Sequence, residues 1–496
     1  PGVVQLLPGQ GETVGAQLTG DDRVRGVMFT GSTEVATLLQ RNIASRLDAQ
    51  GRPIPLIAET GGMNAMIVDS SALTEQVVID VLASAFDSAG QRCSALRVLC
   101  LQDEIADHTL KMLRGAMAEC RMGNPGRLTT DIGPVIDSEA KANIERHIQT
   151  MRSKGRPVVQ AVRENCEDAR EWQSGTFVAP TLIELDDFAE LQKEVFGPVL
   201  HVVRYNRNQL PELIEQINAS GYGLTLGVHT RIDETIAQVT GSAHVGNLYV
   251  NRNMVGAVVG VQPFGGEGLS GTGPKAGGPL YLYRLLANRP ESALAVTLAR
   301  QDAEYPVDAQ LKAALTQPLN ALREWAANRP ELQALCTQYG ELAQAGTQRL
   351  LPGPTGERNT WTLLPRERVL CIADDERDAL TQLAAVLAVG SQVLWPDDAL
   401  HRQLVKALPS AVSERIQLAK AENITAQPFD AVIFHGDSDQ LRALCEAVAA
   451  RDGAIVSVQG FARGESNILL ERLYIERSLS VNTAAAGGNA SLMTIG

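Results

Sequence analysis

Residues 25–34 read RGVMFTGSTE and residues 55–62 read PLIAETGG, and these two stretches decide the fold class. In each stretch, a short apolar run that is typical of a β-strand ends in a polar turn that contains glycine. Residues 35–47 and 77–88, which follow them, have the apolar spacing of helices. Because strands that alternate with helices form a mostly parallel sheet, this part of the sequence predicts an α/β fold.

The carboxy-terminal part of the sequence shows the same alternation. Residues 308–345 have apolar side chains at helical spacing and predict one or two helices, whereas 350–359 (LLPGPTGERN) predict a linker or turn. The sequence VIFHG at 432–436 echoes VMFTG at 27–31, which indicates either a second copy of half a nucleotide fold or a chance resemblance. Strand candidates lie at 368–373, 391–394, 431–434 and 454–458.

The composition argues against several classes of function. The 496 residues carry 44 Lys and Arg against 57 Asp and Glu, a formal net charge of −13. Because such a surface repels phosphate backbones and anionic lipid, we expect this chain to bind neither nucleic acid nor membrane. No apolar run reaches the length of a membrane span. The start, PGVVQLLPG, lacks both Met and signal-peptide features, so we expect the chain to come from a longer protein.

The cysteines indicate a reducing compartment. They form no C-x-x-C pair, and no His stands at metal-ligand spacing beside them, so we expect no metal site. An odd, unpatterned set in a large chain is typical of reduced thiols, and we expect a cytoplasmic protein. The ordinary interpretation of each is a small buried hydrophobic side chain. The seven cysteines are at positions 93, 100, 120, 166, 336, 371 and 445.

Cys93 departs from that interpretation because it lies in the polar sequence GQRCS at 90–94. Arg92 is expected to favour its thiolate, which is the nucleophilic form. Glu59 ends the strand predicted at 55–58, where α/β folds place their ligands, although it could instead cap a helix. It precedes Cys93 by 34 residues. A nucleophile and a carboxylate base are therefore the candidate catalytic pair.

Five motifs in one order, FTGSTE, ETGG, GQRCS, KEVFGPV and PFGG, resemble the aldehyde dehydrogenase superfamily over roughly residues 1–290. The resemblance implies a Rossmann-type cofactor domain, incomplete at its amino terminus, an α/β catalytic domain, and a second α/β unit that lacks catalytic residues. The implied domains are 1–62 (second half of the NAD-binding domain), 63–262 (catalytic), 263–300 (return to the cofactor domain), 301–360 (helical linker) and 361–496 (aldehyde-dehydrogenase-like).

The resemblance can be narrowed to one branch. The loop 256–266 (GAVVGVQPFGG), together with Ser94, is similar to glutamate-γ-semialdehyde dehydrogenases. The tail 481–492 (VNTAAAGGNASL) is similar to the end of bacterial bifunctional proline-degrading enzymes. That likeness implies NAD-dependent oxidation of L-glutamate γ-semialdehyde to L-glutamate, in a homodimer. It also implies an FAD-dependent proline dehydrogenase region elsewhere in the longer protein and, in some bacteria, a DNA-binding repressor region.

The resemblance also implies roles for individual residues. Cys93 would attack the aldehyde to give a thiohemiacetal and then a thioester, with its own backbone N–H as one oxyanion donor, and Glu59 would activate the hydrolytic water. The remaining roles are pyrophosphate contact by Gly31 and Ser32, ribose contact by Glu194 beside Phe196, and substrate binding by Ser94, Gly256, Ala257 and Phe264. Two of these have plain alternatives, since Glu194 could be a solvated turn residue and Phe264 a core residue.

Three other functions stay open at this point. The nearest is a dehydrogenase of another semialdehyde, and the loop that begins at Gly256 distinguishes the two because a substrate carboxylate needs free backbone N–H groups. A cofactor-free thioester or ester hydrolase could use Cys93 and Glu59, but it would not need FTGSTE or KEVFGPV. Residues 300–496 could also be a scaffold without chemistry, whose task is to pack against other surfaces.

Overall fold

The computed structural model describes residues 2–161, 175–286, 304–305 and 309–484. The first unit is a parallel pair of strands, β1 (Val27–Thr30) and β2 (Leu56–Glu59), joined by helix α2 (Thr33–Ala44) and preceded by η1 (Gly11–Gly15) and α1 (Ala16–Gly20). The strand and helix expected from RGVMFTGSTE are thus confirmed. Their order brings the polar ends of both strands to one edge.

An 11-stranded sheet dominates the described residues. Its six central strands, in the order β10, β9, β3, β4, β7 and β6, are parallel, as the alternation of strands and helices predicts. In sheet order the strands are β12 (Glu304–Tyr305), β13 (Gln348–Leu351), β14 (Glu357–Pro365), β20 (Tyr474–Asn482), β10 (Asn247–Val250), β9 (Thr225–His229), β3 (Ala65–Val68), β4 (Val98–Gln102), β7 (Val199–Tyr205), β6 (Thr181–Leu185) and β5 (Val158–Gln160).

Amphipathic helices cover this sheet and close its main hydrophobic core. They are α3 (Thr74–Phe86), α4 (Asp103–Glu119), α5 (Ser138–Ser153), α7 (Leu210–Ala219) and α8 (Asp233–Ser242), with the short helices η2 (Asp87–Gly90), η3 (Phe188–Glu190), η4 (Arg207–Gln209) and α9 (Tyr281–Leu285). A small antiparallel pair, β8 (Tyr222–Gly223) and β11 (Glu267–Gly268), holds the glycine-rich loop beside the sheet.

The carboxy-terminal unit has its own five-stranded parallel sheet, which confirms the second α/β pattern. In sheet order it contains β17 (Ile416–Ala419), β16 (Gln392–Pro396), β15 (Arg368–Ile372), β18 (Ala431–His435) and β19 (Ser457–Phe461). Its helices are α11 (Ala309–Trp325), η5 (Ala326–Asn328), α12 (Pro330–Leu342), α13 (Glu376–Val389), α14 (Ala399–Ala407), α15 (Ser410–Ser413), η6 (Ala421–Ala426), α16 (Ser438–Ala449) and η7 (Leu470–Leu473). Cys371 and Cys445 are buried in this unit, as expected.

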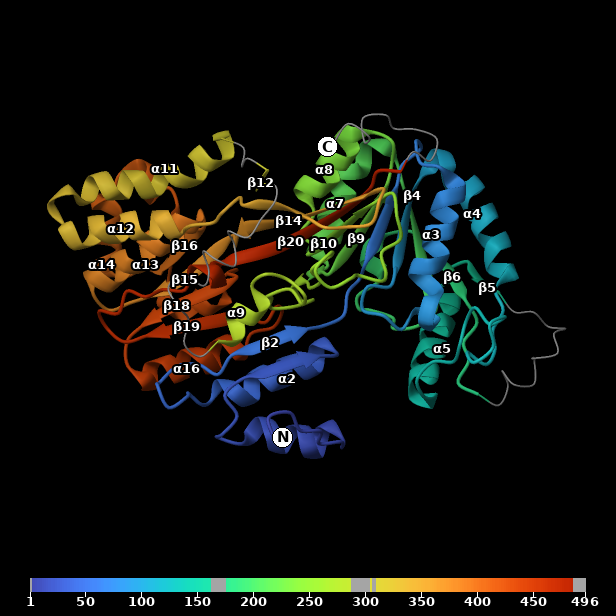
Figure 1. Cartoon of the computed structure of the whole chain (residues 1–496), viewed down its shortest axis with the longest axis horizontal. Coiled ribbons are helices and arrows are strands. Elements are labelled where there is room, and N and C mark those ends of the chain that lie inside the picture. The colour runs from blue at the N-terminus through green and yellow to red at the C-terminus, as the bar shows by residue number, and fades with distance from the viewer. Residues whose placement is uncertain (1, 162–174, 287–303, 306–308, 485–496) are drawn as a thin grey trace.

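Of the two interpretations of 350–359, a linker or a turn, the structure confirms the turn. Strands β13 and β14 form a hairpin there, and β14 pairs antiparallel with β20 along nine residue pairs. Because β20 in turn pairs parallel with β10, the hairpin crosses from the carboxy-terminal unit into the large sheet (Figure 1). The boundary expected at 360 therefore falls inside β14, and the last expected strand, 454–458, lies instead at 457–461.

Candidate active site

Glu59 stands at the end of β2, held by two neighbouring segments. Its carbonyl accepts a hydrogen bond from the Gly31 N–H at 3.1 Å, and it forms an isolated bridge with Gly271. The Gly266 N–H donates to Glu59 Oε2 at 3.2 Å, whereas Glu59 Oε1 is buried without a hydrogen-bond partner among the described residues. Burial raises the pKa of Glu59 to about 8, against the opposing charge of Lys275. A buried carboxyl with such a pKa is suited to take a proton near neutral pH.

Cys93 lies in a tight turn that follows α3. Ser88 and Ala89 both have φ of 56°, and Gly90 has φ of 67°, so three successive residues adopt left-handed backbone. A Cβ at Gly90 would lie 2.2 Å from the carbonyl oxygen of Gly197, which explains the glycine. Left-handed residues other than glycine are strained and persist only where the surroundings hold them. The turn therefore depends on contacts from other parts of the chain.

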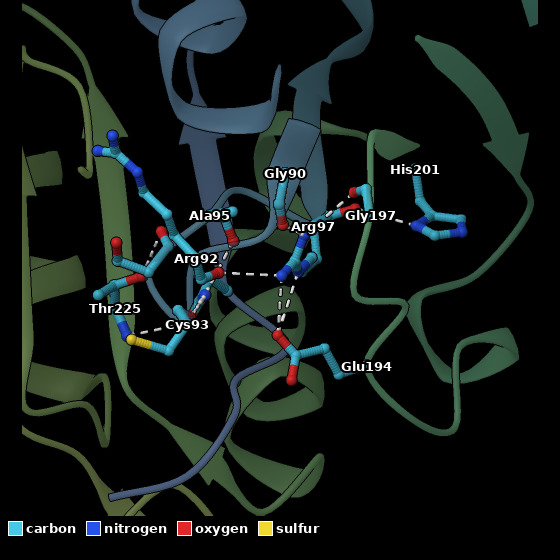
Figure 2. A network of polar contacts seen from close by, with 11 residues as sticks. Gly90, Arg92, Cys93, Ala95, Arg97, Glu194, Gly197, His201 and Thr225 are labelled. Atoms are coloured by element: carbon cyan, nitrogen blue, oxygen red, sulfur yellow. Dashed lines mark hydrogen bonds and ion pairs between the residues drawn. The ribbon is translucent and has the colours of Figure 1, made fainter. Parts of the chain in front are cut away.

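Two side chains hold this turn. Asn64, just before β3, donates from Nδ2 to the carbonyls of Cys93 at 2.6 Å and Ala95 at 2.9 Å, while its Oδ1 accepts from the Thr225 N–H. Arg97 is fully buried and donates to the carbonyls of Gly90 at 2.7 Å and Arg92 at 3.0 Å (Figure 2). The sequence analysis missed both residues. An arginine inside the apolar run ALRVLCL was the available signal.

Arg97 also brings the motif KEVFGPV to the cysteine. Its guanidinium donates to Glu194 Oε1 at 3.0 and 3.2 Å (Figure 2). The guanidinium carbon also lies 5.2 Å from the centroid of the Phe196 ring. A Cβ on Gly61 would meet Glu194 Oε2 at 1.9 Å, so the carboxylate sits against the ETGG turn. Motifs that are far apart in the sequence are thus in contact around Cys93 and Glu59.

The expectation that Arg92 favours the thiolate is wrong, because its Nε donates to Ser88 Oγ at 3.0 Å. Burial raises the pKa of the Cys93 thiol, and the negative charges of Glu194 and Glu59 raise it further. Backbone N–H groups of Ser94 and Cys93 act in the opposite direction. Burial and these two carboxylates therefore oppose ionisation of the Cys93 thiol, and nucleophilic attack requires that a base remove its proton.

The residues expected to bind the cofactor lie directly after β1 and shortly before β7. Ser32 caps α2, where its Oγ accepts from the Val35 N–H at 3.2 Å, and this helix amino terminus is exposed. A Cβ on Gly31 would lie 2.4 Å from the ring of Phe29, and Phe196 is 46% exposed. A free helix amino terminus and an accessible aromatic ring fit a dinucleotide.

The residues expected to bind substrate are split between two places. Ser94 is buried beside the cysteine, whereas Gly256 (φ 80°) and Ala257 are exposed in the loop after β10. Ser84 links the two places, since its Oγ accepts from the Met254 N–H at 3.0 Å and its carbonyl from the Leu96 N–H. Phe264 is half-buried and bridges to Ala276.

Comparison with known proteins agrees with this geometry. Residues 1–287 match the aldehyde dehydrogenase family. The chain belongs to the aldehyde dehydrogenase family. The fold expected for it from the sequence is therefore confirmed, and members of this family use a nicotinamide cofactor. No helix in the described part of the chain is long and apolar enough to cross a membrane.

Several relatives are close in sequence. The chain is 99% identical over its whole length to bifunctional protein PutA of Escherichia coli, and it spans 38% of that protein. A 1-pyrroline-5-carboxylate dehydrogenase of Bacillus cereus is 35% identical over 57% of this chain and 53% of its own length. A solved 1-pyrroline-5-carboxylate dehydrogenase from Thermus with bound NAD is 38% identical, has a TM-score of 0.52, and covers 57% of this chain and 53% of its own.

The strained turn before the cysteine gives a first prediction. Gly90→Ala places a methyl group against the Gly197 carbonyl and adds roughly 1–2 kcal/mol of left-handed backbone strain. We expect a lower melting temperature and at least tenfold slower turnover, measured by calorimetry and by NADH absorbance. Gly115→Ala in α4 is the control, because nothing lies within 4 Å of its Cβ and alanine favours a helix by about 1 kcal/mol. Equal stability of the two variants would contradict this account.

Proposed function

We propose that this chain supplies the site that oxidises L-glutamate γ-semialdehyde to L-glutamate with NAD. The observation that carries the proposal is that the buried carboxyl of Glu59 lies near enough to Cys93 to raise the pKa of its thiol, in a site to which several of the family motifs contribute. The names of the relatives support the substrate, because 1-pyrroline-5-carboxylate is the cyclic form of this semialdehyde. The residues expected from the sequence keep their roles as part of this proposal.

The proposed mechanism uses the chain's own groups. Cys93 Sγ bonds to the aldehyde carbon after Glu59 takes the thiol proton and passes it to solvent, and the backbone N–H of Cys93 is one donor to the oxyanion of the thiohemiacetal. When bound, the nicotinamide supplies the acceptor for the hydride. Glu59 then takes a proton from the water that attacks the thioester, and the Cys93 thiolate leaves and regains a proton as glutamate forms. Ser94, Gly256 and Ala257 hold the amino-acid end of the substrate, and Phe264 packs on its methylenes.

The longer protein adds further proposals. The bifunctional name of the Escherichia coli relative supports a second activity in that longer protein. An FAD-dependent proline dehydrogenase region there and, in some bacteria, a DNA-binding repressor region are proposals that rest on the sequence resemblance. A homodimer in the cytoplasm, and NAD in preference to NADP, remain predictions of the same kind. Rates measured with NAD and NADP side by side test the last of these directly.

The substrate anchor is tested by two glycines of one loop. Gly256 and Gly260 both have φ near 80°, and neither has an atom within 4 Å of its Cβ position, so alanine strains both equally. In the whole protein, we expect Gly256→Ala to raise KM for the semialdehyde about tenfold while propanal oxidation is unchanged, because hydrogen bonds to a charged group contribute about 1.5–3 kcal/mol. Gly260→Ala should have a smaller effect on that KM.

The outcomes separate the open functions. If wild-type protein oxidises propanal and the semialdehyde with equal efficiency, the dehydrogenase activity is supported but the substrate anchor at Gly256 is not. If an ester is hydrolysed and no aldehyde yields NADH, the cofactor-free hydrolase is correct instead.

A further inference from the structure

A fully buried lysine lies behind the general base, and the mechanism above gives it no role. Lys275 follows the glycine-rich loop and is 2% exposed. Its Nζ donates to the Gly265 carbonyl and, at 2.7 Å, to Asn247 Oδ1. Asn247 also accepts from the Gly265 N–H at 3.2 Å. Lysine is almost never fully buried without a partner, so this placement calls for a function.

One peptide group connects this lysine to Glu59. The carbonyl of the peptide between Gly265 and Gly266 accepts from Lys275 Nζ, and the N–H of the same peptide donates to Glu59 Oε2 at 3.2 Å. A cation on the carbonyl polarises the peptide and strengthens the N–H as a donor. The ammonium group therefore fixes and polarises the one hydrogen bond that the described residues make to the catalytic carboxylate.

Glu476 meets the same lysine from a distant part of the chain. It lies on β20, outside residues 1–287, and is 8% exposed. Its Oε2 accepts from the Lys275 backbone N–H at 2.8 Å, and its Oε1 accepts from Trp361 Nε1, on β14, at 3.0 Å. These two strands pair with each other antiparallel, and β20 also pairs with β10 of the large sheet (Figure 1). The Glu476 carboxyl is thus held in place beside Lys275 by two hydrogen bonds.

We propose that Lys275 and Glu476 are positioning residues for the general base. Lys275 holds the peptide that binds Glu59, and Glu476, carried by β20, keeps Lys275 protonated inside the protein. The proposal rests on the role proposed above for Glu59. It assigns a positioning task to the carboxy-terminal part of the chain, for which the sequence predicts no nucleophile or base.

The charges around the site are consistent with this assignment. Burial lowers the pKa of Lys275, and Glu476 opposes that change more than any other carboxylate. Lys275 in turn lowers the pKa of Glu59, an effect larger than the opposite effect of Glu476. Removing Lys275, or removing Glu476 so that Lys275 loses its proton, should therefore leave Glu59 with less positive charge nearby. The other charged or titratable groups that face these residues are Cys93, Glu267 and Arg477, of which the last two form their own ion pair at 3.5 Å.

The test is the pH dependence of thioester hydrolysis in the whole protein, compared for Lys275→Met and Glu476→Gln. We expect both variants to move the midpoint upward by about one pH unit, which is a roughly tenfold loss of kcat at pH 7. KM for the semialdehyde should change less than threefold. Glu476→Gln keeps an oxygen acceptor of the same size, so it tests the charge in a folded protein even if Lys275→Met fails to fold.

A carboxylate on β14, the strand that pairs with β20, provides the matched control. Glu357, on β14, is paired with Arg252 and Gln262 and has no contact with Glu59 among the described residues. Glu357→Gln should leave the pH midpoint in place. An unchanged or lowered midpoint in Glu476→Gln, with melting temperature retained, would overturn the inference.

A further variant separates this inference from the proposed function. Glu59→Gln should abolish the midpoint in the pH dependence of thioester hydrolysis. If it does so while the Lys275 and Glu476 variants keep a wild-type midpoint, only the positioning role fails. If Glu59→Gln keeps the midpoint, the proposed general base fails as well.

Discussion

Cys93→Ala should reduce NADH formation from L-glutamate γ-semialdehyde by roughly 10⁴-fold or more, because removal of a nucleophile leaves no covalent route. The alanine side chain is smaller, and the turn is held by the backbone contacts of Asn64 and Arg97, so the fold should persist. The rate is measured by absorbance in the whole protein with saturating NAD. Circular dichroism of the same sample establishes that the variant is folded.

A second cysteine provides the control for this prediction. Cys120 is a half-buried thiol directly after α4, and it belongs to none of the five motifs. Cys120→Ala should keep nearly full activity. Alkylation should inactivate wild-type protein and the Cys120 variant alike, with Cys93 as the modified residue in a peptide digest. Full activity of Cys93→Ala would remove the central assignment of the site.

Glu59→Gln should slow steady-state turnover by about 10²–10⁴-fold, since general-base catalysis contributes that much. At pH 9, where solvent can ionise the thiol, the variant should still release about one equivalent of NADH in a rapid burst. The thioester then accumulates because no base activates the water. Rapid mixing with absorbance detection measures the burst, and mass spectrometry of the quenched protein detects the acyl adduct.

The pH profile identifies the base independently. Burial raises the pKa of Glu59 to about 8, so a larger fraction is ionised as pH increases and wild-type hydrolysis should rise through pH 8. Asp80 in α3 is a second buried carboxyl, whose pKa burial raises to about 6. Asp80→Asn should keep the midpoint near 8, whereas Glu59→Gln should lose it. A midpoint near pH 6 that disappears in Asp80→Asn would mean that Asp80, and not Glu59, determines the pH profile.

Local sequence predicted much of the fold. The apolar run before FTGSTE and the helical spacing after it produced β1 and α2 within two or three residues, because strand and helix periodicities are short-range properties. The same reasoning found α11, α12 and the carboxy-terminal parallel strands. It failed at 350–359, where two prolines and two glycines mark a turn but give no information about which strand the flanking residues pair with.

The candidate site, like the fold, could be predicted from the sequence only in part. Cys93 and Glu59 could be predicted because each stands in a short polar motif with an unusual residue between small neighbours. Arg92 was chosen as the activating cation because it adjoins the cysteine, but the backbone turn directs it to Ser88. Adjacency in sequence does not fix the direction of a side chain, and the strained backbone at 88–90 does.

The sequence by itself determined the family and predicted a candidate nucleophile and a candidate base, since these depend on short motifs in a fixed order. Only the tertiary structure decided what surrounds them. Arg97 meets Glu194 across 97 residues, and Lys275 meets Glu476 across 201. Such pairs follow no periodicity, because they depend on which strands become neighbours in the sheet. Burial then sets their electrostatic effect, since a charge acts strongly only where water is excluded.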